Sequence, residues 1–144
     1  MAVYQAESMP RVAREDMNAV HAEEIEMVNR IGELIEAVEQ GAEPAPLHEA
    51  LDAWLAHTRA HFDNEHRIME ETGFPAYPVH RAEHERVLAQ LEEVVRRYEE
   101  NGELALLRQF VFEIWPGWFD NHVNTMDFAT AHFAEMAARG GPPV

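Results

Sequence analysis

Apolar side chains recur at helical spacing along most of the chain. Four regions, at about 15–40, 47–71, 78–100 and 104–138, place apolar residues three or four positions apart. This period is typical of α-helices that bury one face. No run of alternating apolar and polar residues indicates a strand. The pattern therefore predicts an all-α fold with four helices.

The breaks between these regions are short. They consist of GAEPAP at 41–46, Gly73 with the following FPAYP, and Asn101 with Gly102. Short connections favour antiparallel neighbours, so we expect an antiparallel up-down-up-down four-helix bundle preceded by an N-terminal extended segment. Pro116 interrupts the last region and should kink the helix or start a new one.

Length and composition limit the classes of protein to consider. With 144 residues, 47% of them hydrophobic, the chain is expected to form one domain, 1–144, with the bundle at about 15–138. A net charge of −16 makes nucleic acid a poor partner, because phosphate binding needs basic patches. The absence of cysteine excludes disulfides and thiolate metal sites. The sequence has neither an apolar span of about 18 residues nor a signal-peptide core, so we expect a cytoplasmic protein without membrane contact.

Histidines lie on the predicted inward faces. Glu65 shares a face with one of them, because residues four apart stack on a helix. Five neutral imidazoles and a carboxylate in a dry interior would be costly unless something binds them. Imidazole and carboxylate without thiolate suit iron, zinc, copper or manganese. Each predicted helix contributes at least one of these histidines: His21, His61, His80 with His84, and His122.

Other kinds of site find no support in the sequence. No histidine has a glutamate three residues before it, as the ferritin-like di-iron motif requires. The zinc-protease motif H-E-x-x-H is also absent. Ser8, the only serine, lies in the N-terminal segment, which excludes Ser-His-Asp catalysis.

The order and spacing of the inward residues resemble the hemerythrins. The resemblance covers about 17–133 and includes flanking residues such as Asn29, Met69, Gly73-Phe74-Pro75 and Trp118-Phe119. The matching motifs are His21, His61-Phe62-x-x-Glu65, His80-x-x-x-His84 and His122-x4-Asp127.

The resemblance implies a non-haem centre of two Fe ions with an oxo or hydroxo bridge. By the helix period alone, Asp127 lies roughly 140° round the helix from His122, on the shoulder of the apolar face. Its place among the ligands therefore depends on the resemblance. The implied ligands are His80, His84 and His122 for one iron, His21 and His61 for the other, and Glu65 and Asp127 as bridges.

The function implied is reversible O₂ binding for storage, delivery or scavenging, at an iron that has five ligands and an open position. An O₂ or redox sensor that signals to a partner, or an enzyme such as a peroxidase or nitric oxide reductase, would use the same centre. We expect a binding protein rather than an enzyme, as a monomer or small homo-oligomer. The candidate residues around the O₂ pocket are Ile25, His57, Phe62 and Trp118.

Three positions depart from the bacterial members of this family, and one of them is Asn18, where an Asp is common three residues before His21. His57 stands where they often have an aromatic residue, typically Tyr, and lies one turn before His61. His66 stands where they usually have a second Glu after Glu65. Because consecutive helical residues diverge by about 100°, we expect His66 at the surface or at its boundary.

Overall fold

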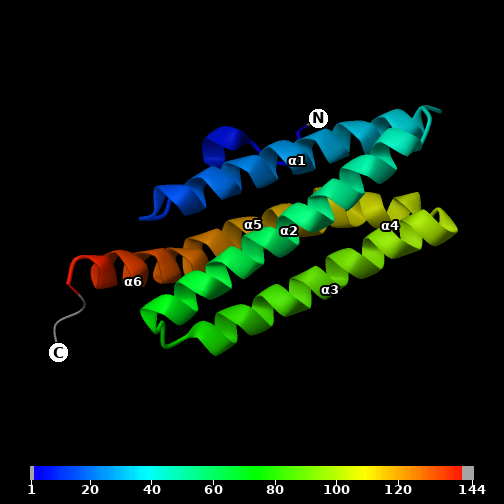
Figure 1. Cartoon of the computed structure of the whole chain (residues 1–144). Helices are drawn as coiled ribbons and strands as arrows, with labels where there is room; N and C mark the ends of the chain where they lie inside the picture. The colour runs from blue at the N-terminus through cyan, green and yellow to red at the C-terminus, as the bar shows by residue number, and fades with distance from the viewer. Residues whose placement is uncertain (1, 141–144) are drawn as a thin grey trace.

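The computed structural model describes residues 2–140 and consists of four long helical stretches lying side by side (Figure 1). No strand occurs within these residues. The predicted all-α helical bundle is confirmed. The first three stretches are α1 (Glu15–Glu39), α2 (Ala45–Thr72) and α3 (Tyr77–Asn101). The fourth runs without a break through α4 (Leu104–Gln109), η2 (Phe110–Ile114), α5 (Trp115–His122), η3 (Val123–Asp127) and α6 (Phe128–Ala138).

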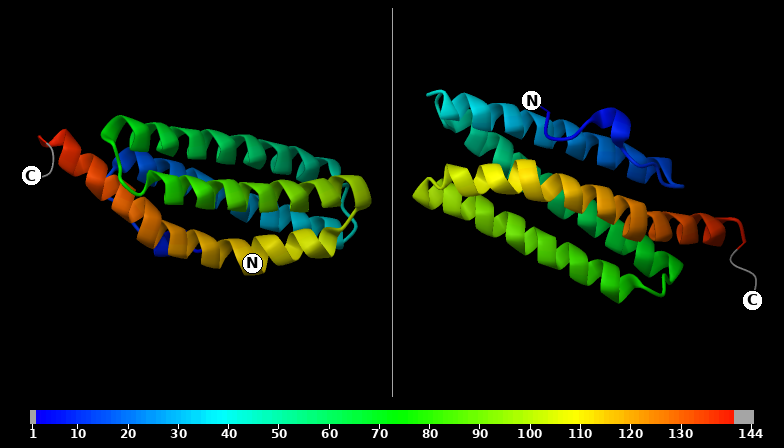
Figure 2. Two further views of the ribbon diagram at one scale, coloured as in Figure 1. Left: turned by 90° about the horizontal axis from the view of Figure 1, so that it is seen from below. Right: turned by 180° about the vertical axis from the view of Figure 1, so that it is seen from behind.

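Each long helix packs against the helix that follows it in the chain. α1 contacts α2, α2 contacts α3 and α3 contacts α4, while α6 returns to α2. The colour gradient in Figure 1 runs in opposite directions along successive helices, and Figure 2 shows the same order from two further sides. The connections are short, as the sequence predicts. Gly73 and Gly102 end α2 and α3 with φ angles of 69° and 70°, a left-handed conformation that glycine adopts without strain.

The fourth stretch departs from a regular α-helix at two places. α5 begins at Trp115 with Pro116 in its first turn, and the π-helical segment η2 directly precedes it. Pro116 has no N–H to donate and its ring crowds the preceding turn, so the backbone there adopts a wider turn. The irregularity predicted at Pro116 is therefore a change from π-helical to α-helical backbone within a continuous stretch, not the start of a separate helix. The second π-helical segment, η3, has no proline and is not predicted by the sequence pattern.

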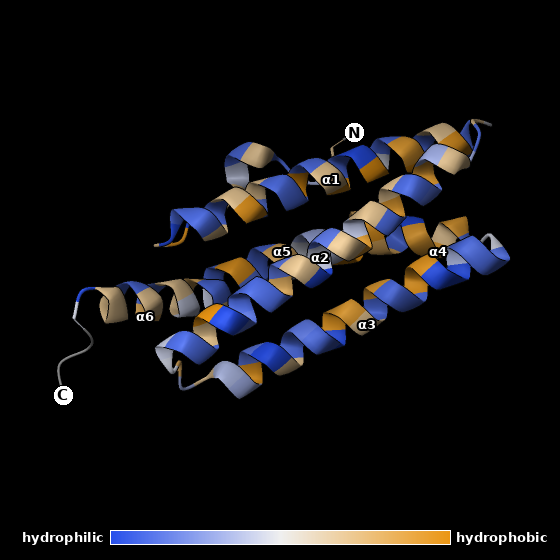
Figure 3. Cartoon of the chain, viewed as in Figure 1, coloured by the Kyte–Doolittle hydropathy of each residue, from blue (hydrophilic) through white to orange (hydrophobic). Residues whose placement is uncertain are grey.

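The interior follows the apolar stripes of the sequence. Figure 3 shows hydrophobic and hydrophilic residues alternating along every helix. Trp54 and Phe110 are among the largest fully buried side chains of the core. Val38, near the end of α1, is only partly buried. None of the described helices is both long and apolar enough to cross a membrane.

The N-terminal segment 2–14 packs along the bundle and contains one 3₁₀ turn, η1 (Ala6–Ser8). Asn29 of α1 accepts hydrogen bonds from the backbone N–H groups of Val3 and Tyr4 at 2.7 and 2.9 Å. The Tyr4 hydroxyl donates to Asp120 of α5 at 2.8 Å. This segment therefore links the first and fourth helical stretches.

Candidate metal centre

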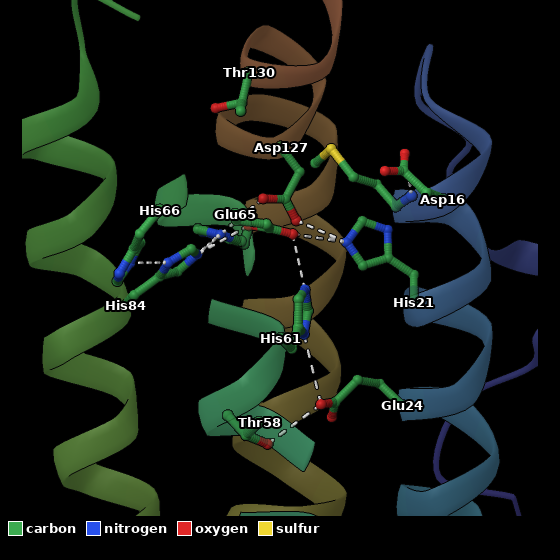
Figure 4. A network of polar contacts seen from close by, with 12 residues as sticks. Asp16, His21, Glu24, Thr58, His61, Glu65, His66, His84, Asp127 and Thr130 are labelled. Carbon is green, nitrogen blue, oxygen red and sulfur yellow. Dashed lines mark hydrogen bonds and ion pairs between the residues drawn. The ribbon is translucent and has the colours of Figure 1, made fainter. Parts of the chain in front are cut away.

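The seven side chains of the predicted ligand set meet inside the bundle. They come from all four helical stretches, and each is at most 8% exposed. Figure 4 shows five of them pointing toward one another. Within the described residues, donor atoms form two overlapping sets, the atoms of each set lying within 4.8 Å of one another. The sets are Glu65, His80, His84, His122 and Asp127, and His21, His61, Glu65 and Asp127.

The Glu65 carboxylate lies between two groups of histidines. Its Oε2 is 2.8 Å from Nε2 of His61 and 3.6 Å from Nε2 of His21. Its Oε1 is 3.3 Å from Nε2 of His84 and 3.5 Å from Nε2 of His80. Each oxygen therefore faces a different group, which is the arrangement that a bridging carboxylate needs.

Asp127 spans the same two groups from the fourth helical stretch. Its Oδ2 lies 3.0 Å from Nε2 of His21, while its Oδ1 lies 3.1 Å from Nε2 of His80 and 3.3 Å from Nε2 of His122. The helix period alone places Asp127 on the shoulder of the helix, and this placement is wrong. The π-helical segment η3 closes from residue i to residue i+5, so Asp127 stands one turn above His122 on the same face.

Three imidazole nitrogens crowd together on one side of the centre. Nε2 of His122 lies 3.1 Å from Nε2 of His80 and 3.0 Å from Nε2 of His84. The outer nitrogen of His80 lies 2.8 Å from Oγ1 of Thr130. If that outer nitrogen donates, Nε2 carries only a lone pair, and facing lone pairs repel unless a cation lies between them. Contacts of roughly 3 Å are what metal–nitrogen bonds of about 2.1 Å at right angles would produce.

Buried polar atoms without hydrogen-bond partners gather at this point. Burial without a partner costs free energy, and metal coordination removes that cost by using the lone pairs. The donor set therefore fits a metal cluster. Among the described residues these atoms are both ring nitrogens of His21, Nδ1 of His61, Oε1 of Glu65 and both carboxylate oxygens of Asp127.

The charges within the centre are strongly coupled. Burial alone would raise the pKa values of Glu65 and Asp127, but the surrounding imidazoles lower both well below the usual range. Burial opposes the charged form of His21, yet the two carboxylates that lie 3.0 and 3.6 Å from its Nε2 raise its pKa to about 9. The pKa of His61 is likewise raised despite burial, whereas burial lowers that of His84 to about 4. The carboxylates thus stay negative, which favours a cation.

His66 lies at the boundary between surface and interior, as the sequence predicts. It is half-buried, and its Nε2 is 2.9 Å from Nδ1 of His84. The divergence of about 100° between neighbouring residues turns His66 away from the centre, but toward α3 rather than toward solvent. His66 therefore contacts the outer edge of one of the seven side chains.

A further buried carboxylate, Glu24, lies beside His61 and is not predicted from the sequence. Glu24 accepts a hydrogen bond from Nε1 of Trp54 at 2.7 Å, and its other oxygen lies 2.7 Å from Nδ1 of His57. His57 is 22% exposed and does not reach the centre itself. Glu24 follows His21 by three residues, and this helical spacing was the signal that could have revealed it.

A cavity of about 20 Å³ adjoins His61. Such a volume holds one molecule the size of water. Of the four pocket candidates, Phe62 and Trp118 line this cavity, whereas Ile25 is packed in the core and His57 lies behind Glu24. The wall is mostly apolar, and its members are Glu24, Thr58, His61, Phe62, Val87, Leu91, Phe110, Trp115, Trp118 and Phe119.

Comparisons with known proteins agree with this geometry. The family described as "Hemerythrin HHE cation binding domain" matches residues 12–131. The chain belongs to the hemerythrin family. A bacteriohemerythrin of Ralstonia nicotianae is 46% identical over 94 residues, which cover 65% of this chain and 66% of that protein. A bacteriohemerythrin of Aquifex aeolicus is 30% identical over 115 residues, 80% of this chain and 85% of that protein.

Membership of the hemerythrin family, together with the donor set, identifies a hemerythrin-type metal-binding protein, and iron is the typical metal of such domains. The region shared with the Ralstonia nicotianae protein spans about two thirds of each chain. No solved structure matches the chain.

Proposed function

We propose that this hemerythrin-family chain holds two iron ions and binds O₂ reversibly. It would do so as one domain, 1–144, built on an up-down-up-down four-helix bundle at about 15–138. The reversal of chain direction between successive helices supports that topology, and the segment 2–14 packs along the bundle (Figure 1). When bound, a pair of ferrous ions supplies the two electrons that O₂ takes up on binding and returns on release.

The distances support a division of the ligands into two groups. Three imidazoles gather at one end of the two carboxylates, and two gather at the other. Each carboxylate then offers one oxygen to each iron. The proposed ligands are His80, His84 and His122 for one iron, His21 and His61 for the other, and Glu65 and Asp127 as bridges.

The observation that carries the proposal is the position of the cavity. It adjoins His61, which belongs to the group of only two imidazoles. An iron held by that group would have one protein ligand fewer than the other iron and would therefore keep a position for a small ligand. A small ligand in this cavity would approach the open position. Phe62 and Trp118 give the cavity apolar walls, which exclude water and retain a small neutral molecule.

An enzyme that uses the same centre, such as a peroxidase or nitric oxide reductase, is the second candidate. Reactions of this kind consume protons. The chain of polar groups from Glu24 on the cavity wall through His57 to the exposed Glu23 favours this candidate, because it reaches solvent. The O₂ experiment below distinguishes the two functions.

Absorption spectroscopy of the iron-loaded, reduced chain tests O₂ binding directly. We expect O₂ to produce a stable new spectrum that degassing reverses. Rapid conversion to the diferric form, without recovery on degassing, would contradict O₂ carriage and favour catalysis or sensing. Nitric oxide and hydrogen peroxide, each added with a reductant, would then be tested for turnover.

The variant His61→Ala tests the assignment of the irons. This change removes an imidazole from the pair and its contact with Glu65 at 2.8 Å, so we expect the chain to lose its two-iron centre. His48→Ala is the matched control, because His48 is a partly exposed histidine of the same helix that belongs to neither donor set. This variant should keep two irons per chain. Two irons per chain in the His61→Ala variant would contradict the assignment.

A further inference from the structure

Glu24 is a buried carboxylate outside the seven proposed ligands. It lies on α1, is 3% exposed, and sits beside the ring of His61 (Figure 4). Burial would raise its pKa, but the hydrogen bond to His57 and the nearby ring of His61 lower it to about 2. Glu24 is therefore a fixed negative charge in the bundle interior.

Three groups hold this carboxylate in place. Trp54 donates its indole N–H to Oε2 at 2.7 Å. Nδ1 of His57 lies 2.7 Å from Oε1, and the Thr58 hydroxyl donates to the same oxygen at 3.3 Å. Two of these groups are fully or mostly buried and all three come from α2, so Glu24 is fixed against the helix that carries His61.

The ring of His61 lies between two carboxylates. Its Nε2 is 2.8 Å from Oε2 of Glu65, while its Nδ1 is 3.5 Å from Oε1 of Glu24. Nδ1 has no hydrogen-bond partner elsewhere in the described part of the chain. A neutral imidazole that offers the lone pair of Nε2 to a metal must carry its hydrogen on Nδ1. That hydrogen then points at Glu24.

We propose that Glu24 is a positioning residue for His61, accepting the Nδ1 hydrogen when Nε2 binds metal. This inference rests on the proposed di-iron function. The hydrogen bond from Nδ1 of His61 to Glu24 fixes the tautomer and the ring orientation of His61, and it makes Nε2 a stronger electron donor to the metal. The adjustment needed is small, because 3.5 Å is only slightly longer than a hydrogen bond.

Glu24 lies beside the group of two imidazoles, not beside the group of three. The outer nitrogen of His80 meets a neutral hydroxyl and that of His84 meets another imidazole. His61 belongs to the group with only two imidazoles, and its outer nitrogen faces a full negative charge. The stronger donation from His61 partly compensates that iron for the third imidazole it lacks.

The test compares full-length Glu24→Gln with the wild type in two measurements. Fe(II) titration without oxygen measures the affinity for each of the two ions, and we expect one of them to bind about 10- to 100-fold more weakly in the variant. Zn(II), a diamagnetic probe, allows the ring N–H of His61 to be observed by NMR. In the wild type we expect a downfield, slowly exchanging proton on Nδ1, which moves upfield or exchanges faster in the variant.

Glu26→Gln is the matched control, because it makes the same change two residues away on α1 at an exposed position outside the polar chain of Glu24, His57 and Glu23. It should alter neither measurement. If Glu24→Gln fails to fold, Trp54→Phe serves instead, since it keeps an aromatic ring and removes one donor to Glu24. We expect a smaller loss of affinity, less than tenfold, and a weaker Nδ1 hydrogen bond.

The outcomes separate this inference from the function on which it rests. Two bound ions with unchanged affinities and an unchanged Nδ1 signal in the Glu24→Gln variant, or in Trp54→Phe if that variant replaces it, would overturn the role of Glu24 alone. A wild type that does not take up two metal ions would overturn the proposed function and this role together.

Discussion

The contact between Thr130 and His80 offers the sharpest test of how the bundle holds its metal centre. Thr130 is 1% exposed, and its Oγ1 lies 2.8 Å from Nδ1 of His80 and 3.7 Å from the sulfur of Met69. If Nε2 of His80 binds metal, as proposed above, its Nδ1 hydrogen must donate to Thr130. The hydroxyl hydrogen of Thr130 is then directed to Met69. Thr130→Val removes the acceptor and keeps the shape of the side chain.

Thr130→Val should lower the free energy of unfolding of the metal-loaded chain, because it leaves the buried Nδ1 hydrogen of His80 without an acceptor. An unsatisfied buried donor costs about 1–3 kcal/mol. For a chain of this size, each kcal/mol shifts Tm by about 2–4 °C, so the metal-loaded variant should melt roughly 2–12 °C below the wild type. The metal-free variant should lose less, because His80 can then move its hydrogen to Nε2. Metal affinity should fall about 10- to 100-fold, as for other partners of metal-bound histidines.

Calorimetry of the metal-loaded and metal-free forms measures both effects. Thr125→Val is the matched control, because its hydroxyl donates to a backbone carbonyl at 2.7 Å on the exposed face of the same helical stretch. Its effect should stay within about 0.5 kcal/mol. Equal Tm values for loaded wild type and loaded Thr130→Val would refute the argument that this hydroxyl fixes the tautomer of His80.

Two further predictions concern pH and the N-terminal segment. Because the raised pKa of His21, about 9, leaves its ring protonated at pH 7 in the metal-free chain, Fe(II) uptake should release protons. Apparent affinity should then rise from pH 6 to pH 9 and level off above it; titration in weak buffer checks this, and a pH-independent affinity would contradict it. Tyr4→Phe loses the 2.8 Å hydrogen bond to the Asp120 carboxylate but keeps the aromatic ring, so it should cost about 1.5–3 kcal/mol in urea unfolding. An unchanged urea midpoint would show that the hydrogen bond between Tyr4 and Asp120 does not stabilise the packing of the N-terminal segment 2–14.

The helices and most of the candidate ligand set could be predicted from the sequence because they depend on local geometry. The apolar period gave helix bounds within two residues, the largest difference being the start of α2 at Ala45 rather than Leu47. The i, i+4 spacing of His61 and Glu65 fixes their shared face whatever the rest of the chain does. Their inward direction follows from the apolar residues on the same stripe.

The position of Asp127 could not be predicted from local helical geometry. A regular helix would turn it roughly 140° from His122, and only the π-helical segment η3 brings it back to the same face. No proline or glycine in VNTMD signals this widening. The backbone adopts it within a long helix whose two sides are already held by neighbouring helices, which the sequence pattern does not reveal.

The sequence by itself determined which side chains each helix turns inward, because helical periodicity is a property of neighbouring residues along one chain segment. Only the tertiary structure decided what those side chains meet across the bundle. Glu24 of α1 faces His61 of α2, and His66 of α2 faces His84 of α3, through the relative rotation and height of packed helices. Those two quantities arise from the fit of whole surfaces, so contacts between helices and the cavity among them became visible only in the folded chain.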